Sequence, residues 1–245
     1  MRDILADLVA EQQSLDQYLQ GIRDRDWDRP TPAKGWSIRD QVSHLASSEE
    51  YAHNAIEEGG SRLAEVADFA DGTAFTDAGV RKGRELRPQA VIEWWRGARA
   101  RVVESLSRAD PARRIPWFAG EMAASTFATA RLMETWAHGL DVHHAFDDEP
   151  EDTDRIRHVC WLGWRALPYA FRHAGEDYER PVRLELIGPH YQKWVFGPDG
   201  TDQAIRGNAG DWARVAVQRR DANETSLSAE GETAKTALRV ARAYV

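Results

Sequence analysis

The chain has 245 residues, with 42% hydrophobic residues, 29% charged residues and a formal net charge of −8. A chain of this length can bury a substantial core, as one large domain or two small ones. The acidic excess argues against nucleic acid or an anionic membrane as the main partner. No apolar run is long enough to span a membrane.

The first residues and the cysteine usage indicate a cytoplasmic protein. Acidic residues at Asp3 and Asp7 interrupt the N-terminal segment, which lacks the apolar core of a signal peptide. Cys160 is the only cysteine, so an intrachain disulfide is excluded, and its apolar neighbours predict a buried, inert thiol. Such cysteine usage is typical of a reducing compartment.

Two amphipathic helices are predicted before residue 60. Residues 2–23 carry apolar side chains at the 3.6-residue period of a helix, and residues 24–35 form a proline-containing loop. The second helix begins at Ser37, which can cap it, and Asp40 completes a pattern similar to a capping box. Gly59 and Gly60 end this helix.

His44 lies inside the second predicted helix, next to its apolar stripe. Its own stripe is mostly small and polar, and includes Asp40, Ser47 and Ser48. Such a stripe suits the wall of a cavity, with Asp40 one turn away as a partner that orients the imidazole. A plain surface or core-edge histidine is the alternative.

The middle of the chain is predicted to hold short helical pieces, a long helix and a loop. Residues 61–87 contain the short pieces, broken near residues 71–72, and Pro88 opens the long helix. Residues 109–121 are predicted to be a loop. In it, Trp117 and Phe118 either line the mouth of a pocket or plug the end of the helices.

The next helix, residues 123–145, carries the densest set of candidate site residues. Glu134 and His138 stand four residues apart and Asp141 follows three later, so all three share one face. A carboxylate and an imidazole at this spacing can share a metal ion, although the pair also arises by chance on exposed helices. Arg131 and Phe127 precede Glu134 on the same face. Arg131 is the best-placed cation for an anionic substrate, and an ordinary salt bridge is its alternative role.

Beyond this helix the chain changes character. His143 and His144 are candidates for proton transfer or spare ligands, or else solvated side chains at a helix end. Residues 147–152 form an acidic linker, and a helix at residues 155–173 is expected to kink at Pro168. Strands are predicted at residues 181–187, 192–196 and 203–206, with helices at residues 209–219 and from about Glu232, and a short strand or loop at residues 226–227.

Two stretches together resemble a known family. Gly35-Trp36-Ser37 followed by His44, and the Glu134, His138, Asp141 helix, are similar to motifs of the DinB-like metalloenzyme superfamily. The branch that includes mycothiol-dependent maleylpyruvate isomerase resembles nearly the whole chain. The resemblance implies an α+β protein with a DinB-like four-helix bundle at residues 1–150. A linker helix and a small sterol-carrier-like α+β domain would occupy residues 151–245.

The resemblance also implies a set of site residues. The family's two histidines and one glutamate bind a divalent metal, usually zinc, so the ligands here would be His44, Glu134 and His138. An arginine of the C-terminal domain reaches the active site in that branch. Arg219 or Arg220 would match it, and we take Arg220, with a solvated helix end as the alternative. The catalytic candidates are therefore Arg131, Asp141 and Arg220, and the residues expected to line a cofactor or substrate pocket are Trp36, Trp117 and Phe127.

Three protein ligands would leave one coordination position open, which is the pattern of a catalytic zinc site. An open zinc lowers the pKa of a bound thiol, so a small thiol such as mycothiol could supply the nucleophile. The resemblance thus implies an isomerase or S-transferase acting on a small electrophilic substrate. Two alternatives remain open, a lyase, hydrolase or cyclase that uses the metal without a thiol, and a non-catalytic metal-containing binding module. The same ligands also suit nickel, iron or manganese, and the sequence does not indicate the oligomeric state.

Overall fold

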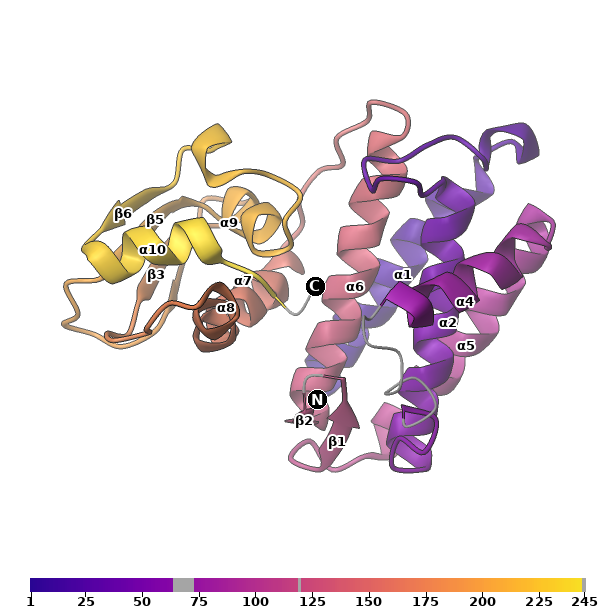
Figure 1. The fold of residues 1–245 in the computed structure, drawn as a ribbon, viewed down its shortest axis with the longest axis horizontal. Coiled ribbons are helices and arrows are strands. Elements are labelled where there is room, and N and C mark those ends of the chain that lie inside the picture. Colours follow the sequence, from indigo (N-terminus) through magenta and orange to yellow (C-terminus); the bar gives the residue numbers. More distant parts are fainter. Residues whose placement is uncertain (64–72, 119, 244–245) are drawn as a thin grey trace. The chain divides into compact units, whose positions relative to one another are not determined.

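Helices dominate the first 150 residues and a four-stranded sheet organises the rest of the chain (Figure 1). The computed structural model describes residues 1–63, 73–118 and 120–243. They divide into two compact units, Met1–Pro150 and Glu151–Val245. The mixture of helices with sheet confirms the predicted α+β class. The helix break predicted near residues 71–72 lies outside the described residues.

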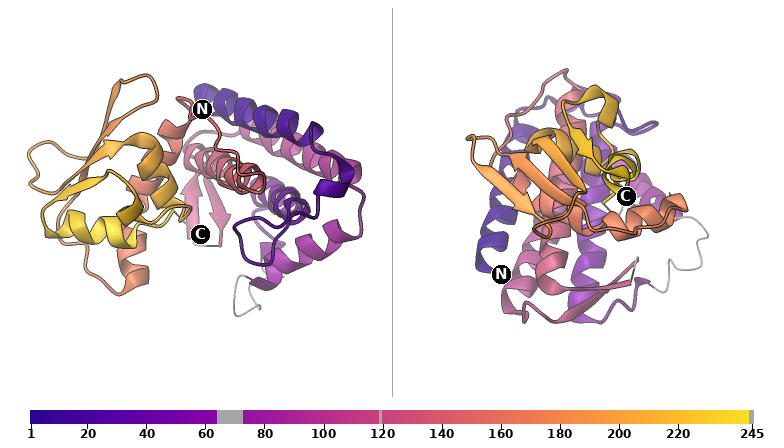
Figure 2. Two further views of the ribbon diagram at one scale, coloured as in Figure 1. Left: turned by 90° about the horizontal axis from the view of Figure 1, so that it is seen from above. Right: turned by 90° about the vertical axis from the view of Figure 1, so that its left-hand side faces the viewer.

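Four long helices form the bundle of the first unit. They are α1 (Arg2–Gln20), α2 (Ile38–Glu57), α5 (Pro88–Arg108) and α6 (Ala124–His144). Helix α2 packs against α5 and α6, α1 packs against α6, and the shorter α4 (Thr73–Arg84) lies along α2 (Figures 1 and 2). Each long helix coincides with a stretch of the sequence whose apolar residues recur at the helical period. None of the helices in the described ranges is long and apolar enough to cross a membrane.

The core of the bundle is built from the apolar stripes of these helices. Leu19 of α1, Val42 of α2 and Trp95 of α5 belong to one buried cluster, together with Trp27, which follows the short 3₁₀ helix η1 (Asp24–Asp26). Trp27 and Trp95 are among the largest fully buried side chains. Burial of this apolar area is the main force that holds the four helices together.

The start of α2 is fixed by the predicted capping box. The Ser37 hydroxyl accepts a hydrogen bond from the Asp40 backbone N–H at 3.3 Å, and the Asp40 carboxylate accepts one from the Ser37 N–H at 2.9 Å. Arg84 of α4 donates two further hydrogen bonds, of 2.9 Å each, to the same carboxylate. Burial tends to raise the pKa of Asp40, but these hydrogen bonds outweigh it and lower the pKa. Asp40 therefore anchors the helix that carries His44 instead of binding the imidazole.

The segment predicted as a loop at residues 109–121 is in part a β-hairpin, so that prediction was wrong there. Strand β1 (Arg114–Trp117) pairs with β2 (Gly120–Ala123) in antiparallel register, with Ile115 opposite Met122. Such short strands, one of which contains a proline, offer too few alternating residues for a period of two to be recognised. At the end of β1, Trp117 is half-buried and Phe118 is 49% exposed.

The second unit begins with two helices where one kinked helix was expected. Helix α7 (Ile156–Arg165) ends before α8 (Leu167–Ala174), and Pro168 lies in the first turn of α8. A proline lacks the N–H that a continuing helix needs, but the first turn of a new helix leaves its N–H groups unpaired in any case. The proline therefore separates two helices instead of bending one.

The sheet of the second unit has the strand order β4-β3-β5-β6. The strands are β3 (Arg183–Ile187), β4 (Lys193–Phe196), β5 (Ala204–Asn208) and β6 (Ser228–Glu230). Strand β3 runs parallel to β5, and the β3–β4 and β5–β6 pairs are antiparallel. Leu184, Phe196 and Ile205 are in register and buried. Helix α9 (Ala209–Ala216) packs on α7 and on the sheet, and α10 (Glu232–Val240) contacts β5 and β6.

The close approach of α4 to α2 provides a test of the bundle packing. A Cβ atom at Gly83 would overlap the side chain of Ser43, whereas a Cβ at Gly97 would meet only Arg101 Nη1 at 3.7 Å. We expect Gly83→Ala to lower the free energy of unfolding by about 1–3 kcal/mol, because it overpacks the contact. Gly97→Ala, in an exposed helical position, should raise it by about 0.5–1 kcal/mol. Urea denaturation measures both, and a Gly83→Ala variant as stable as the wild type would contradict the described packing.

Candidate metal centre

Helices α2 and α6 bring the three predicted ligands together. Glu134 Oε2 lies 3.6 Å from His44 Nε2 and 3.4 Å from His138 Nε2. One donor atom of each residue lies within 4.8 Å of the others. In the part of the chain that the structure describes, this is the one cluster of three or more metal-ligating side chains.

The geometry of the three donors suits a zinc ion. Zinc bonds to imidazole nitrogen and carboxylate oxygen are about 2.0–2.2 Å long, so the donors of a tetrahedral site stand about 3.3–3.5 Å apart. The separations of 3.4 and 3.6 Å from Glu134 are close to these values. Two imidazoles and one carboxylate are also a common ligand set for other first-row metals.

The protonation states of Glu134 and His44 are those that a metal ligand needs. Burial acts to raise the pKa of Glu134, but hydrogen bonds with His138 and His44 and the charge of Arg131 hold that pKa well below its usual range. Burial lowers the pKa of His44, against the opposing effect of Glu134. At neutral pH the carboxylate is therefore ionised and the His44 imidazole is neutral, and only these forms can ligate.

Gln41 is a candidate site residue that the sequence analysis missed. Its Oε1 lies 2.6 Å from His138 Nδ1, and its Nε2 donates to Thr31 Oγ1 at 2.9 Å. The Thr31 hydroxyl in turn donates to the backbone oxygen of Trp36 at 3.0 Å. An amide oxygen can only accept, so His138 Nδ1 carries the proton and Nε2 keeps its lone pair for a metal. Histidine ligands of metals usually have such a partner on the other ring nitrogen.

The position of Gln41 contained a usable signal. It lies three residues before His44 on the same helix, so the two side chains project from one face.

Asp141, which the sequence analysis favoured, is only 1% exposed, and its Oδ2 lies 3.9 Å from His138 Nδ1. That distance is too long for a hydrogen bond. Gln41 is therefore the direct partner of His138, and Asp141 lies beyond hydrogen-bonding distance of the same nitrogen.

The three predicted aromatic residues lie in two places. The Trp36 ring lies beside both histidines, with ring centroids 5.2 Å from His44 and 6.0 Å from His138. Trp117 and Phe127 instead surround Arg131, whose guanidinium carbon lies 5.0 and 5.7 Å from their ring centroids. Trp36 thus forms a wall of the metal-ligating cluster, whereas the other two rings enclose the neighbouring cation.

Arg131 is held inside the bundle, one turn before Glu134. Only 2% of its surface is exposed, and its Nη1 donates a 2.7 Å hydrogen bond to the hydroxyl of Ser48. Its charge contributes to the lowered pKa of Glu134. The structure therefore places this guanidinium within electrostatic range of the three ligands.

Arg220 belongs to the second unit. Its Nη1 lies 3.0 Å from Asp211 Oδ1, and Arg219 Nη1 donates to the backbone oxygen of Val217 at 2.9 Å. Both arginines line a cavity of about 770 Å³, together with Lys235 and other residues of that unit. The approach of Arg220 to the metal ligands stays a prediction.

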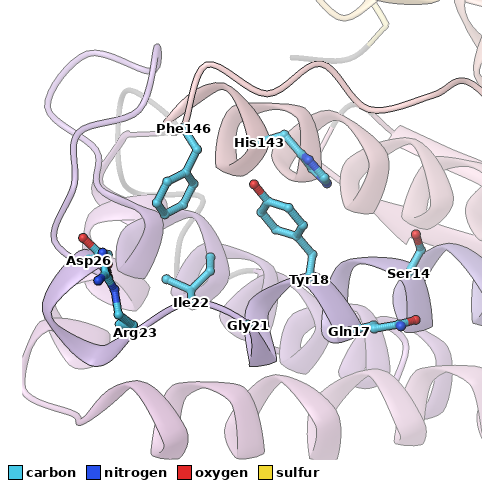
Figure 3. Close-up of a pocket in the computed structure, with 9 residues that line it drawn as sticks. All are labelled: Ser14, Gln17, Tyr18, Gly21, Ile22, Arg23, Asp26, His143 and Phe146. Carbon is cyan, nitrogen blue, oxygen red and sulfur yellow. Dashed lines mark hydrogen bonds and ion pairs between the residues drawn. The ribbon is translucent and has the colours of Figure 1, made fainter.

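The two histidines at the end of α6 lie outside the metal-ligating cluster. His143 Nδ1 lies 2.7 Å from Asp148 Oδ2, and His144 Nε2 lies 2.9 Å from Glu149 Oε2. Figure 3 shows His143 stacked on Tyr18, with ring centroids 3.7 Å apart, in a pocket of about 680 Å³ between α1 and the end of α6. None of the three candidate ligands lines this pocket. His143 and His144 thus contact the carboxylates of Asp148 and Glu149, which follow α6 in the chain, and lie outside the cluster of candidate ligands.

Two solved structures share the fold of the chain. They are the crystal structure of a mycothiol-dependent maleylpyruvate isomerase and that of a histidine-to-alanine mutant of this enzyme, with TM-scores of 0.62 and 0.63. Each match covers 93% of this chain and 92% of the solved chain. The sequences are 16% and 14% identical to this one, so the likeness shows a common fold.

Sequence comparisons show the family. Two proteins from strains of Mycobacterium tuberculosis, "Uncharacterized protein MT0041" and "Uncharacterized protein Rv0036c", are each 35% identical to this chain over 243 residues, which is 98% of this chain and 94% of theirs. The family model described as "Mycothiol maleylpyruvate isomerase N-terminal domain" matches residues 8–143. These matches confirm the resemblance seen in the sequence. The chain belongs to the family of the mycothiol maleylpyruvate isomerase N-terminal domain.

Proposed function

We propose that this protein is a zinc-dependent enzyme that uses a small thiol, mycothiol, to act on a small electrophilic substrate as an isomerase or an S-transferase. The observation that carries the proposal is the convergence of His44, Glu134 and His138 from two helices, with donor separations that suit one metal ion. Membership of the family supports the thiol, because the solved relatives with this fold are mycothiol-dependent isomerases.

The protein's own thiol is unsuited to the reaction. Cys160 is the single cysteine, it is fully buried, and its Sγ faces the backbone oxygen of Ala209 at 3.3 Å. Burial raises the pKa of the Cys160 thiol far above its usual range. A nucleophilic thiolate must therefore come from a second small molecule, which favours a thiol cosubstrate over catalysis by the protein's cysteine.

His44, Glu134 and His138 would hold the zinc ion and leave a coordination position for the thiol. The ion would lower the pKa of a thiol bound at that position. The residues around the ligands then have separate tasks. Gln41 holds His138 in the ligating tautomer, and the Trp36 ring excludes water from one side of the two imidazoles.

The other predicted residues keep proposed roles. Arg131 supplies positive charge near the ligands for an anionic group of the substrate, and Trp117 and Phe127 form the apolar surround of that charge. The carboxylate of Asp141, whose Oδ2 lies 3.9 Å from His138 Nδ1, adds negative charge near that imidazole and so favours the binding of a cation. Arg220 is proposed as the contribution of the second unit to binding.

The ligand assignment predicts metal loss on substitution. We expect His44→Ala and His138→Ala each to reduce the metal content from one equivalent per chain to a small fraction, because two ligands bind zinc poorly. Elemental mass spectrometry on purified protein measures this, with circular dichroism to confirm a folded bundle. His53→Ala is the matched control, since His53 is also on α2 but contacts Ser105. Full metal content in both ligand variants would show that the assignment is wrong.

The role of Gln41 predicts a graded effect. We expect Gln41→Leu to weaken zinc binding roughly tenfold, because His138 loses the acceptor that fixes its tautomer. Gln41→Glu keeps an acceptor and should bind zinc at least as tightly as the wild type. Competition with a chromophoric chelator gives the dissociation constants. Equal constants for Gln41→Leu and the wild type would exclude this role.

The proposed thiol cosubstrate predicts that the zinc-loaded protein binds mycothiol and needs it for turnover. Calorimetric titration with mycothiol should show one site per chain, and the His44→Ala variant should show none, because the metal is lost. Turnover of an electrophilic substrate such as maleylpyruvate should then require the thiol. Zinc without thiol binding would indicate a lyase, hydrolase or cyclase instead. Absence of metal, or a metal needed only for folding, would indicate a binding module.

A further inference from the structure

A second carboxylate, that of Glu49, lies in the interior of the same bundle. Glu49 is on α2, five residues after His44, and has no exposed surface. Neither of its carboxylate oxygens has a hydrogen-bond partner among the residues that the structure describes. A buried carboxylate without hydrogen bonds needs compensation from a nearby cation.

Three charged groups of the neighbouring helices act electrostatically on Glu49. Arg131 and Arg99 lower the pKa of its carboxyl, whereas burial and Glu134 raise it, to about 7 overall. The Arg99 guanidinium is already engaged, since it forms an ion pair with Asp16 and donates to a backbone oxygen of α1. The charge of Arg99 still acts on Glu49, because Asp16 is shared with Arg96, but the described hydrogen bonds of Arg99 go to other groups.

Arg131 differs from Arg99 because none of its described hydrogen bonds goes to a carboxylate. Its described hydrogen bond goes to the neutral hydroxyl of Ser48, the residue next to Glu49 in α2. Its Nε is buried and has no hydrogen-bond partner in the described part of the chain. Its guanidinium also lies one turn from Glu134 and acts on the charge of that residue. Arg131 is thus the cation that connects Glu49 with the candidate ligands.

We propose that Glu49 is a positioning residue of the metal centre, whose carboxylate balances the charge of Arg131 so that the guanidinium does not oppose the binding of a cation at His44, Glu134 and His138. This inference rests on the proposed metal site but not on the thiol. In the absence of a metal, Arg131 keeps Glu134 ionised and ready to ligate. When the metal binds, the same positive charge would repel it, and the carboxylate of Glu49 offsets that repulsion.

The charge balance predicts a change in zinc affinity without any change in the ligands. At pH 8, where the Glu49 carboxyl is mainly ionised, we expect Glu49→Gln to bind zinc roughly tenfold more weakly than the wild type. The dissociation constants come from competition with a chromophoric chelator. Glu50→Gln is the matched control, because Glu50 is the next residue of α2 and is half-buried beside Lys82 and Arg101 at 3.8 and 3.9 Å. Its zinc affinity should equal that of the wild type.

Two double variants separate charge from packing. Glu49→Gln with Arg131→Met removes both charges and keeps an apolar stem against the two aromatic rings, so its zinc affinity should return close to the wild-type value. Glu49→Gln with Arg131→Lys keeps the positive charge and should stay weak. Thermal unfolding of each variant confirms that it is folded.

The outcomes distinguish this inference from the proposed function. A wild-type protein that binds no zinc would overturn both. If the wild type binds zinc and Glu49→Gln binds it equally tightly, only the role of Glu49 is overturned. Equal weakening in both double variants would show that Glu49 acts through packing and not through charge, and would also overturn the inference.

Discussion

The burial of an ionised glutamate between two imidazoles is the constraint on which the rest of the first unit depends. Glu134 stays ionised in the bundle because hydrogen bonds with His138 and His44 and the positive charge of Arg131 lower the pKa of its carboxyl. An isolated carboxylate in such surroundings would take up a proton instead. The two helices hold three polar side chains within a few ångströms of one another, and the proposed metal ion would satisfy all of them at once.

Several contacts around α2 serve this constraint. The capping box at Ser37 and the paired hydrogen bonds from Arg84 determine where the helix begins. The glycines of α4 allow a second helix to lie directly on α2. Gln41 then connects the loop before the helix with His138 on α6. One continuous set of contacts thus determines where α2 begins, how α4 packs on it and which tautomer His138 adopts. The geometry of the candidate ligands therefore depends on the whole bundle.

The family relationship and the site agree on the kind of chemistry but come from different observations. The matches cover nearly the whole chain and identify the fold and the family. The donor distances, the ionised Glu134 and the buried Cys160 come from the structure, and they support the proposal of a metal site that uses an external thiol. The second unit keeps its own cavity with Arg219 and Arg220, which is where a cosubstrate specific to this family would be sought.

The sequence alone determined the α+β class, the long helices and most strands, because helical periodicity is a local property. The resemblance to the family singled out His44, Glu134 and His138, which the structure brings together, and their role as metal ligands stays a prediction. The sequence analysis missed the β1–β2 hairpin and the helix break before Pro168, where a few residues carry too little pattern. Only the tertiary structure shows that Gln41 contacts His138 and that Arg131 acts electrostatically on the buried Glu49. Both pairs join residues of different helices that lie far apart in the chain, and no local periodicity records which faces of two helices will meet.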